Sequence, residues 1–172
     1  MRKKTLITVI LTFTIFCFIV LLKGLSTSNL YVPKQTIEKK LSQFNAKQLF
    51  SNKIISSDDV FVEDKIYMLN IWSSWCAPCR AEHKILMQLS KNPLLNIIGL
   101  NYKDNEKSAK KYVSQLGNPY NEILVDEEGT ISISLGAYGV PETLLIKQNK
   151  ILKKYLGPLN KESIEEINLF IK

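Results

Sequence analysis

The pattern of apolar and polar residues divides the chain into an apolar N-terminal run and a longer region of mixed character. Residues 5–22 contain no charged side chain, and as a helix they would span about 27 Å, close to the roughly 30 Å hydrocarbon core of a bilayer. The basic residues Arg2, Lys3 and Lys4 precede this run, which favours a cytoplasmic N-terminus and an exported remainder. We therefore predict a membrane anchor over residues 1–23, followed by a linker over 24–35.

A cleaved signal peptide is the alternative interpretation of the same run. Such a peptide usually has an apolar core of about 7–15 residues that ends at small residues. Residues 26–28 (Ser-Thr-Ser) offer only weak cleavage sites, so the length of the run favours a retained anchor. Cys17 lies inside the run after the bulky Phe16, and we interpret it as a small apolar residue in lipid and not as a lipidation site.

Beyond the linker, short β-prone runs alternate with segments of helical periodicity. The order of these elements predicts an α/β domain over residues 36–172, with a mixed central sheet and helices on both faces. Before residue 60 the pattern is weak and indicates only a helix near 37–41 and one short hairpin. The later predicted elements are strand 66–72, helix 78–89, strand 96–102, helix 108–116, strand 122–125, a hairpin of strands 143–146 and 151–156, and a terminal helix 161–171.

Composition and charge exclude several classes of protein. A hydrophobic share of 45% and a charged share of 23% are ordinary for a globular protein and exclude wholesale disorder. The net charge is +7, of which +4 lies before residue 24, so the basic balance does not indicate a nucleic-acid surface. Three cysteines are too few for a scaffold held by several disulfides. Two of them, Cys76 and Cys79, are close together and form the candidate chemical site.

Cys76 and Cys79 stand where a predicted strand is followed by a predicted helix. Two cysteines one helical turn apart can close a disulfide with little backbone adjustment. At the start of the helix, Cys76 would meet unpaired backbone N–H groups and the positive end of the helix dipole, which favour a nucleophilic thiolate. Cys79 would be shielded one turn further on, where it suits the attack that resolves a mixed disulfide. Pro78 would keep this first turn stiff.

Three other interpretations of the cysteine pair are weaker. A structural zinc site needs four ligands, and His83, the only histidine, brings the nearby set to three. Covalent haem attachment needs a histidine directly after the second cysteine, where this chain has Arg80. A purely structural disulfide that encloses only two residues would constrain the unfolded chain little. We therefore predict a redox-active dithiol that uses neither a metal nor a cofactor.

A second candidate element is the proline within residues 138–143 (Tyr-Gly-Val-Pro-Glu-Thr). A proline at the entry to a β-prone run removes a hydrogen-bond donor from the sheet. A cis Val140–Pro141 bond could place the backbone of Val140 beside Cys76, where an extended substrate could form hydrogen bonds. A trans proline in an ordinary turn is the alternative, and the conjunction with the cysteine pair favours the cis form.

Four segments of the chain carry a family resemblance. They are LNIWSSWCAPCRAEH (69–83), GLNYKD (99–104), LGNPY (116–120) and GAYGVPET (136–143). With them the chain resembles the thioredoxin superfamily and, over residues 60–172, the membrane-anchored thiol:disulfide proteins of cytochrome c biogenesis called CcmG or DsbE. The resemblance implies a thioredoxin-like fold, Cys76 as the attacking thiol, Cys79 as the resolving thiol, and a cis Pro141.

The resemblance also draws attention to residues around the cysteines. Ordinary thioredoxins carry a buried aspartate six residues before the first cysteine, whereas this chain has Asn70, which cannot titrate and agrees with the biogenesis branch. Glu82 and Glu142 match acidic positions of that branch and would tune a thiol pKa or relay its proton. Solvated surface carboxylates are the alternative for both. The residues expected to wall the substrate site are Trp75, Tyr138, Val140 and Pro141.

The function implied by the resemblance is the reduction of disulfides during cytochrome c maturation. The protein would be a single-pass inner-membrane protein with a periplasmic domain, acting on apocytochrome c or a CcmH-like protein. Haem attachment needs free thiols, whereas the periplasm is oxidising. After each reaction a transmembrane electron donor of the DsbD or CcdA kind would reduce the protein's own disulfide again. Two alternatives stay open: a general reductase or oxidase of the TlpA or ResA kind, and a module that binds apocytochrome without exchanging electrons.

Overall fold

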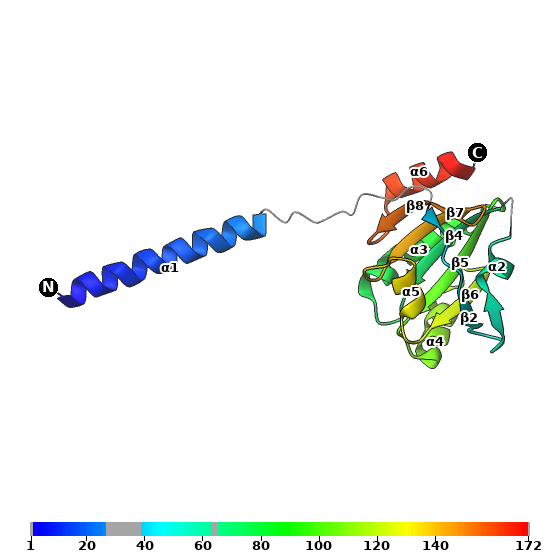
Figure 1. Ribbon diagram of the computed structural model, residues 1–172, viewed down its shortest axis with the longest axis horizontal. Helices are drawn as coiled ribbons and strands as arrows, with labels where there is room; N and C mark the ends of the chain where they lie inside the picture. The colour runs from blue at the N-terminus through cyan, green and yellow to red at the C-terminus, as the bar shows by residue number, and fades with distance from the viewer. Residues whose placement is uncertain (1, 27–38, 63–64, 172) are drawn as a thin grey trace. The chain divides into compact units, whose positions relative to one another are not determined.

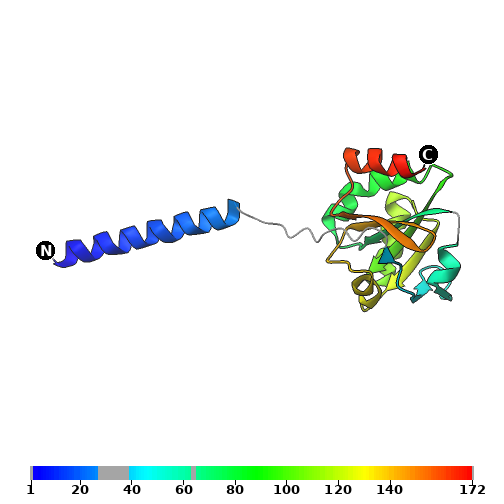
Figure 2. The same cartoon turned by 45° about the horizontal axis from the view of Figure 1, so that its top comes forward.

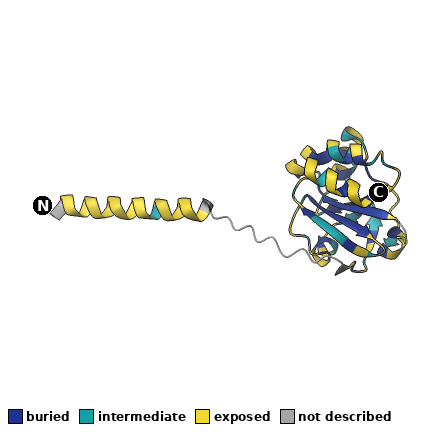
Figure 3. Cartoon of the chain, turned by 90° about the horizontal axis from the view of Figure 1, so that it is seen from above, coloured by how far each residue is buried: buried dark blue, intermediate teal, exposed yellow. Residues whose placement is uncertain are grey.

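The chain consists of two units, Met1–Lys34 and Gln35–Lys172, and the computed structural model describes residues 2–26, 39–62 and 65–171. In the first unit, helix α1 (Arg2–Ser26) exposes its apolar side chains (Figure 3). Its stretch Lys4–Gly24 is long and apolar enough to cross a membrane, a test that a signal sequence also meets. Most of the predicted linker, residues 27–35, lies outside the described residues.

The second unit is built on an eight-stranded mixed sheet with the order β1-β8-β7-β4-β5-β6-β2-β3 (Figure 1). The central strand β4 (Ile66–Trp72) is buried along its whole length, which explains its continuous apolar run. It pairs in parallel with β5 (Leu95–Tyr102) and antiparallel with β7 (Glu142–Lys147). Next to these strands, β6 (Glu122–Asp126) is parallel to β5, and β8 (Lys150–Leu156) forms the predicted hairpin with β7.

Helices cover both faces of this sheet, as predicted. Helices α3 (Ala77–Leu89), α4 (Glu106–Leu116) and α6 (Lys161–Ile171) contribute to one core cluster, and Figure 2 shows α6 beside α3 on that face. The second core cluster, on the other face, includes Val60 of α2 (Ser57–Val60) and residues at α5 (Thr130–Ser134). The cysteine pair lies where β4 leads into α3, at one end of the sheet.

The region before residue 60 adds three strands to the sheet. The predicted hairpin is formed by β2 (Asn45–Gln48) and β3 (Ile54–Ser56), and β2 also pairs with β6. Strand β1 (Lys39–Lys40) pairs with β8, so the helix predicted near 37–41 is wrong over residues 39–41; residues 37 and 38 lie outside the described part of the chain. These strands are too short for a period of two to stand out in the sequence.

Helix α5 is the element that sequence patterns missed after residue 60. Gly129, directly before this helix, adopts a left-handed conformation with φ 74°. The carboxylate of Asp126 then accepts hydrogen bonds from the backbone N–H groups of Ile131 and Ser132 and from the Ser132 hydroxyl. This cap comes from the end of β6 and not from the residue before the helix, so the usual sequence signal is absent.

Candidate active site

The two cysteines form the start of helix α3. Cys76 is the N-cap residue, and the backbone N–H of Cys79 donates a hydrogen bond to its sulfur over 3.1 Å. A disulfide joins the two residues, with an S–S distance of 2.04 Å and 5.3 Å between their Cα atoms. Pro78 lies in the first turn, where its missing N–H has no partner to lose. Helix α3 therefore begins at Cys76, and the sulfur of Cys76 accepts a hydrogen bond from one of the free N–H groups in the first turn.

The surroundings of the two sulfur atoms differ. Both residues are nearly buried, Cys76 with 4% and Cys79 with 1% of its surface exposed. On reduction, the hydrogen bond from Cys79 N–H and the positive end of the helix dipole would stabilise a thiolate on Cys76. Cys79 is the third residue of α3, and its sulfur is not at the N-cap position. This arrangement suits Cys76 to attack a disulfide and Cys79 to resolve the product.

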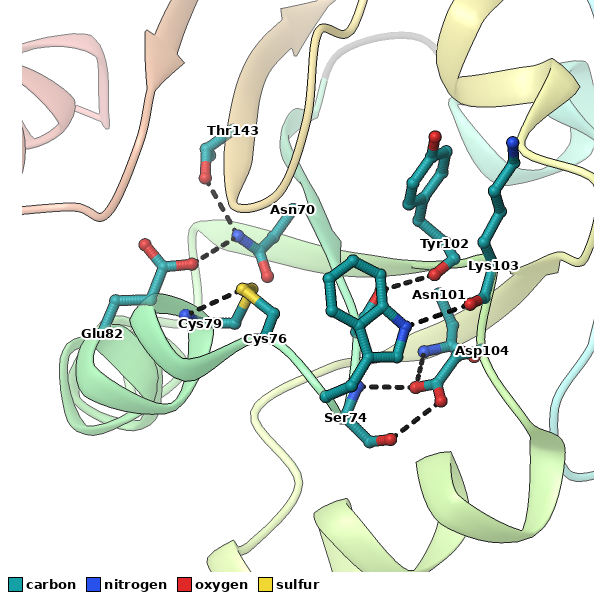
Figure 4. The surroundings of a disulfide bond; sticks show 12 residues. Asn70, Ser74, Cys76, Cys79, Glu82, Asn101, Tyr102, Lys103, Asp104 and Thr143 are labelled. Atoms are coloured by element: carbon teal, nitrogen blue, oxygen red, sulfur yellow. Dashed lines mark hydrogen bonds between the residues drawn. A yellow bond between two sulfur atoms is a disulfide. The ribbon is translucent and has the colours of Figure 1, made fainter.

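The loop before Cys76 is held by the end of β5. Asp104 accepts hydrogen bonds from the backbone and the hydroxyl of Ser74, and from the amide of Asn101 over 3.0 Å (Figure 4). The indole N–H of Trp75 donates to the carbonyl of Lys103 over 3.0 Å, while 60% of the Trp75 surface stays exposed. Asp104 ends the resembling segment 99–104, but its contact to Ser74 is not visible in the local sequence pattern.

On the other side of the disulfide, Asn70 and Glu82 form a buried network (Figure 4). The amide nitrogen of Asn70 donates to Glu82 Oε1 and to Thr143 Oγ1, both over 3.0 Å. Its amide oxygen accepts a hydrogen bond from the Tyr120 hydroxyl over 2.9 Å. The second oxygen of Glu82 accepts from the backbone N–H of Leu159 over 2.7 Å. Sequence reasoning found Asn70 and Glu82 but missed these three partners, of which Tyr120 and Thr143 each end a resembling segment.

Glu82 combines deep burial with proximity to Cys79. Only 1% of its surface is exposed, and it lies one helical turn after Cys79, on the same side of α3. Burial raises the pKa of the Glu82 carboxyl, and the hydrogen bonds from Leu159 and Asn70 offset part of that rise. A carboxyl group whose pKa is raised towards that of a thiol is better matched for exchanging a proton with it. The surface alternative for Glu82 is therefore wrong.

Glu142 is also buried, with 3% of its surface exposed, but it has different partners. One carboxylate oxygen accepts hydrogen bonds from the backbone N–H groups of Tyr138 and Gly139, over 2.6 and 2.9 Å. The other lies 2.7 Å from the ammonium nitrogen of Lys154. Glu142 follows the Val140–Pro141 bond, which is cis, as predicted. Its carboxylate thus holds the loop that contains the cis proline, and the surface alternative is wrong here too.

The residues predicted to wall the substrate site differ in exposure. Tyr138 is 70% exposed, and the Lys154 ammonium lies 4.6 Å from the centre of its ring. Val140 is half-buried and packs against the core cluster that contains both cysteines, while Pro141 is buried. Together with the exposed Trp75, Tyr138 leaves aromatic surface available for an incoming chain.

The single histidine belongs to the packing between α3 and α4. His83 Nε2 lies 3.0 Å from the carbonyl oxygen of Gly117, and its ring packs edge-on against Tyr112 with centroids 5.1 Å apart. Burial lowers the pKa of His83. Within the described ranges 2–26, 39–62 and 65–171, no group of three or more His, Cys, Asp or Glu side chains is arranged to hold a metal ion.

Comparisons with known proteins identify the family of the chain. Residues 37–155 match the AhpC/TSA family. The thiol:disulfide interchange protein DsbE of Haemophilus influenzae is 35% identical over 166 residues, which cover 94% of this chain and 91% of that protein. The DsbE of Escherichia coli K12 is 39% identical over 131 residues, or 76% of this chain and 70% of that protein.

Solved structures show the fold. A secreted thiol-disulfide isomerase from Corynebacterium glutamicum superposes with a TM-score of 0.67 at 22% identity, covering 82% of this chain and 95% of its own. The second unit therefore has a thioredoxin-like fold, as predicted. The relatives from Haemophilus influenzae and Escherichia coli are thiol:disulfide interchange proteins, and this chain carries a cysteine pair at the start of α3, so the protein is a thiol:disulfide oxidoreductase. The chain belongs to the AhpC/TSA family and, within it, to the DsbE thiol:disulfide interchange proteins.

Proposed function

We propose that this protein is a membrane-anchored reductant of cytochrome c maturation that acts through its Cys76-Ala-Pro-Cys79 dithiol. The observation that carries the proposal is the unequal surroundings of the two sulfurs. A helix start stabilises a thiolate on Cys76, and the buried carboxyl of Glu82 lies one turn after Cys79. The four segments that resemble CcmG and DsbE proteins support the assignment to cytochrome c maturation.

The reaction proceeds through two exchanges. The Cys76 thiolate attacks one sulfur of the target disulfide, a mixed disulfide forms, and the other target sulfur leaves as a thiolate. Cys79 passes its proton to the Glu82 carboxylate and attacks the sulfur of Cys76. This step releases the second target thiolate and leaves the Cys76–Cys79 disulfide. The dithiol thus gives two electrons to the target, and a second dithiol must return them.

The substrate is apocytochrome c or a CcmH-like protein, presented as an extended segment. The exposed rings of Trp75 and Tyr138 would contact its side chains, and the backbone of Val140, before the buried Pro141, would hydrogen-bond its main chain. This mode of binding suits an unfolded apocytochrome, because main-chain hydrogen bonds require no preformed surface on the partner.

The direction of electron flow follows from the location we propose. Helix α1, with Arg2 to Lys4 at its start, serves as a single-pass anchor with a cytoplasmic N-terminus, which leaves the thioredoxin-like domain in the periplasm. Cysteines of an apocytochrome tend to pair in this oxidising compartment, whereas haem attachment requires them free. A transmembrane donor of the DsbD or CcdA kind would then reduce the Cys76–Cys79 disulfide.

Trapping of mixed disulfides tests this proposal. A Cys79→Ala variant, expressed in place of the natural chain, keeps the nucleophile but cannot resolve the intermediate, so we expect covalent adducts with apocytochrome c or a maturation protein. Cys76→Ala is the matched control and should trap none of these partners. Adducts that contain only unrelated periplasmic proteins would instead indicate a general reductase of the TlpA or ResA kind. Normal cytochrome maturation in the Cys76→Ala strain would indicate a non-catalytic binding module.

A further inference from the structure

The amide of Asn70 makes three hydrogen bonds in a fully buried position. Its nitrogen donates to Glu82 and Thr143, and its oxygen accepts from Tyr120. A rotation of the amide by half a turn would exchange the oxygen and the nitrogen and present an acceptor to Glu82. The aliphatic hydroxyl of Thr143 donates and accepts about equally well, so it does not decide between the two orientations. The phenolic hydroxyl of Tyr120 is a stronger donor than acceptor, because its oxygen lone pair is delocalised into the ring. The remaining contacts, to Tyr120 and Glu82, must therefore decide.

We propose that Tyr120 is a positioning residue that fixes the Asn70 amide with its N–H towards Glu82 and so keeps Glu82 ready to accept the Cys79 proton. This inference rests on the proton route given under Proposed function. An ionised carboxylate only accepts hydrogen bonds, so it needs the amide nitrogen, whereas a protonated carboxyl group can donate to the amide oxygen. Because the Tyr120 hydroxyl donates more strongly than it accepts, it favours the orientation in which the Asn70 oxygen accepts from it, and this orientation favours the ionised form of Glu82.

The direction of the Tyr120 hydroxyl is fixed by the packing of the Tyr120 ring. Its ring stacks on Trp72, with centroids 5.6 Å apart and planes 16° apart. Gly99 makes room for it, because a Cβ at this position would lie 3.0 Å from the Tyr120 ring. The backbone N–H of Tyr120 donates to the side chain of Asn118 over 3.1 Å. The ring therefore stacks on Trp72 in the space that Gly99 leaves, and its hydroxyl reaches Asn70 from the segment between α4 and β6.

Removal of this hydroxyl changes which protonation state of Glu82 is favoured. In Tyr120→Phe, the amide oxygen of Asn70 loses its donor and can turn towards Glu82. That orientation favours a protonated carboxyl group, which cannot take the proton of Cys79. The step in which Cys79 attacks should then require a higher pH, while the earlier attack by Cys76 is unaffected.

The test uses the full-length chain in detergent, reduced and then mixed with 5,5′-dithiobis(2-nitrobenzoate). Attack by Cys76 releases one coloured thiolate, and attack by Cys79 on the resulting mixed disulfide releases a second. In Tyr120→Phe we expect the pH midpoint of the second release to rise by about one unit, the size expected for one hydrogen bond to a buried acceptor. The first release should keep its midpoint.

Tyr112→Phe is a matched control. The Tyr112 hydroxyl is buried and has no hydrogen-bond partner among the described residues, and its ring packs 4.9 Å from the same Trp72. We expect both releases to be unchanged in this variant. In a Glu82→Gln background, the addition of Tyr120→Phe should shift nothing further. A Tyr120→Phe profile equal to that of the natural chain, or an equal shift with Gln at position 82, would overturn the proposal.

A direct titration separates this inference from the proposed proton route. The Glu82 carboxyl, followed by ¹³C NMR in the oxidised chain, should titrate at higher pH in Tyr120→Phe than in the natural chain. If Glu82 titrates at higher pH in Tyr120→Phe, but Glu82→Gln leaves the second release unchanged, the proton route through Glu82 is wrong and the positioning by Tyr120 stands. If Glu82→Gln slows the second release, but the pH at which Glu82 titrates is the same in Tyr120→Phe and the natural chain, the positioning by Tyr120 is wrong and the proton route through Glu82 stands.

Discussion

Glu82 and Glu142 are carboxylates of nearly equal burial that have different kinds of partner. Glu82 is held by the Asn70 amide and one backbone N–H, both of them neutral donors. Glu142 is held by two backbone N–H groups and by the ammonium group of Lys154. From the sequence both were assigned the same tuning or relay role, although one lies inside a helix and the other at the start of a strand.

The difference shows that burial does not by itself make a proton acceptor. Desolvation penalises the charged form of a carboxyl group, and a neighbouring cation offsets that penalty. Glu82 has neutral donors, and its pKa is raised. The charge of Glu142 is matched at 2.7 Å by Lys154, so its carboxylate is suited to hold a loop. We therefore assign proton transfer to Glu82, and to Glu142 the shape of the loop before Pro141.

The largest expected effect comes from breaking the ion pair of Glu142. Lys154→Met would leave a carboxylate with a side chain only 4% exposed and no counter-charge. Loss of one partner from a buried pair is strongly destabilising, and we expect the free energy of unfolding to fall by about 3 kcal/mol. Denaturant unfolding of the full-length chain in detergent, followed by tryptophan fluorescence, measures this change.

The neighbouring lysine provides the control for this experiment. Lys153 pairs with Glu166 over 3.1 Å, but their side chains are 27% and 47% exposed. Exposed pairs contribute little, so Lys153→Met should lower the free energy of unfolding by less than about 1 kcal/mol. Equal losses in the two variants would mean that Glu142 does not depend on its cation, and the contrast with Glu82 would fail.

The fold was predictable where the local pattern reflects burial on both faces or the start of a helix. The continuous apolar run of β4 follows from its central place in the sheet, and the cysteine pair with Pro78 indicated the start of α3. Before residue 60 the pattern indicated one hairpin, but neither the bounds of the strands nor their place in the sheet. Their place depends on pairing with β6 and β8, which lie far along the chain.

The active site was predictable as a set of reactive groups but not as a network. Asn70 and Glu82 were identified from the family resemblance, whereas their partners lie 50 to 77 positions away in sequence. The local pattern of apolar and polar residues carries no information about contacts over such a separation. For the same reason, the cation beside Glu142 could not be inferred from the sequence, because Lys154 comes from the next strand in the sheet.

An intermediate effect is expected from Glu82→Gln and from its dependence on pH. A carboxyl group whose pKa is raised in the folded state binds its proton more tightly there, so stability falls as the pH rises from its ordinary value of 4.5 through the raised pKa. Glutamine does not titrate. The variant should therefore gain stability relative to the natural chain over that range, by about 1.4 kcal/mol per unit of the rise, and the difference should be constant at higher pH.

Glu142→Gln is the comparison for this measurement. It removes the counter-charge of Lys154, whose side chain is only 18% exposed, so at neutral pH the variant should be less stable than the natural chain. Urea unfolding at several pH values measures both variants under one protocol. A gain in stability for Glu142→Gln at neutral pH, or a difference for Glu82→Gln that does not change with pH, would contradict the contrast between the two carboxylates.

The smallest expected change in stability is at Tyr138. Its ring lies 4.6 Å from the Lys154 ammonium and is largely exposed, so the cation–π contact contributes about 0.5–1 kcal/mol. The contact of Tyr138 to Glu142 is made by its backbone N–H and not by its side chain, so Tyr138→Leu keeps the loop in place. We expect unfolding to change by no more than about 1 kcal/mol, while the rate with a peptide disulfide falls more than the rate with a small aromatic disulfide. A loss of stability as large as that of Lys154→Met would show that the loop depends on the ring and not on the ion pair.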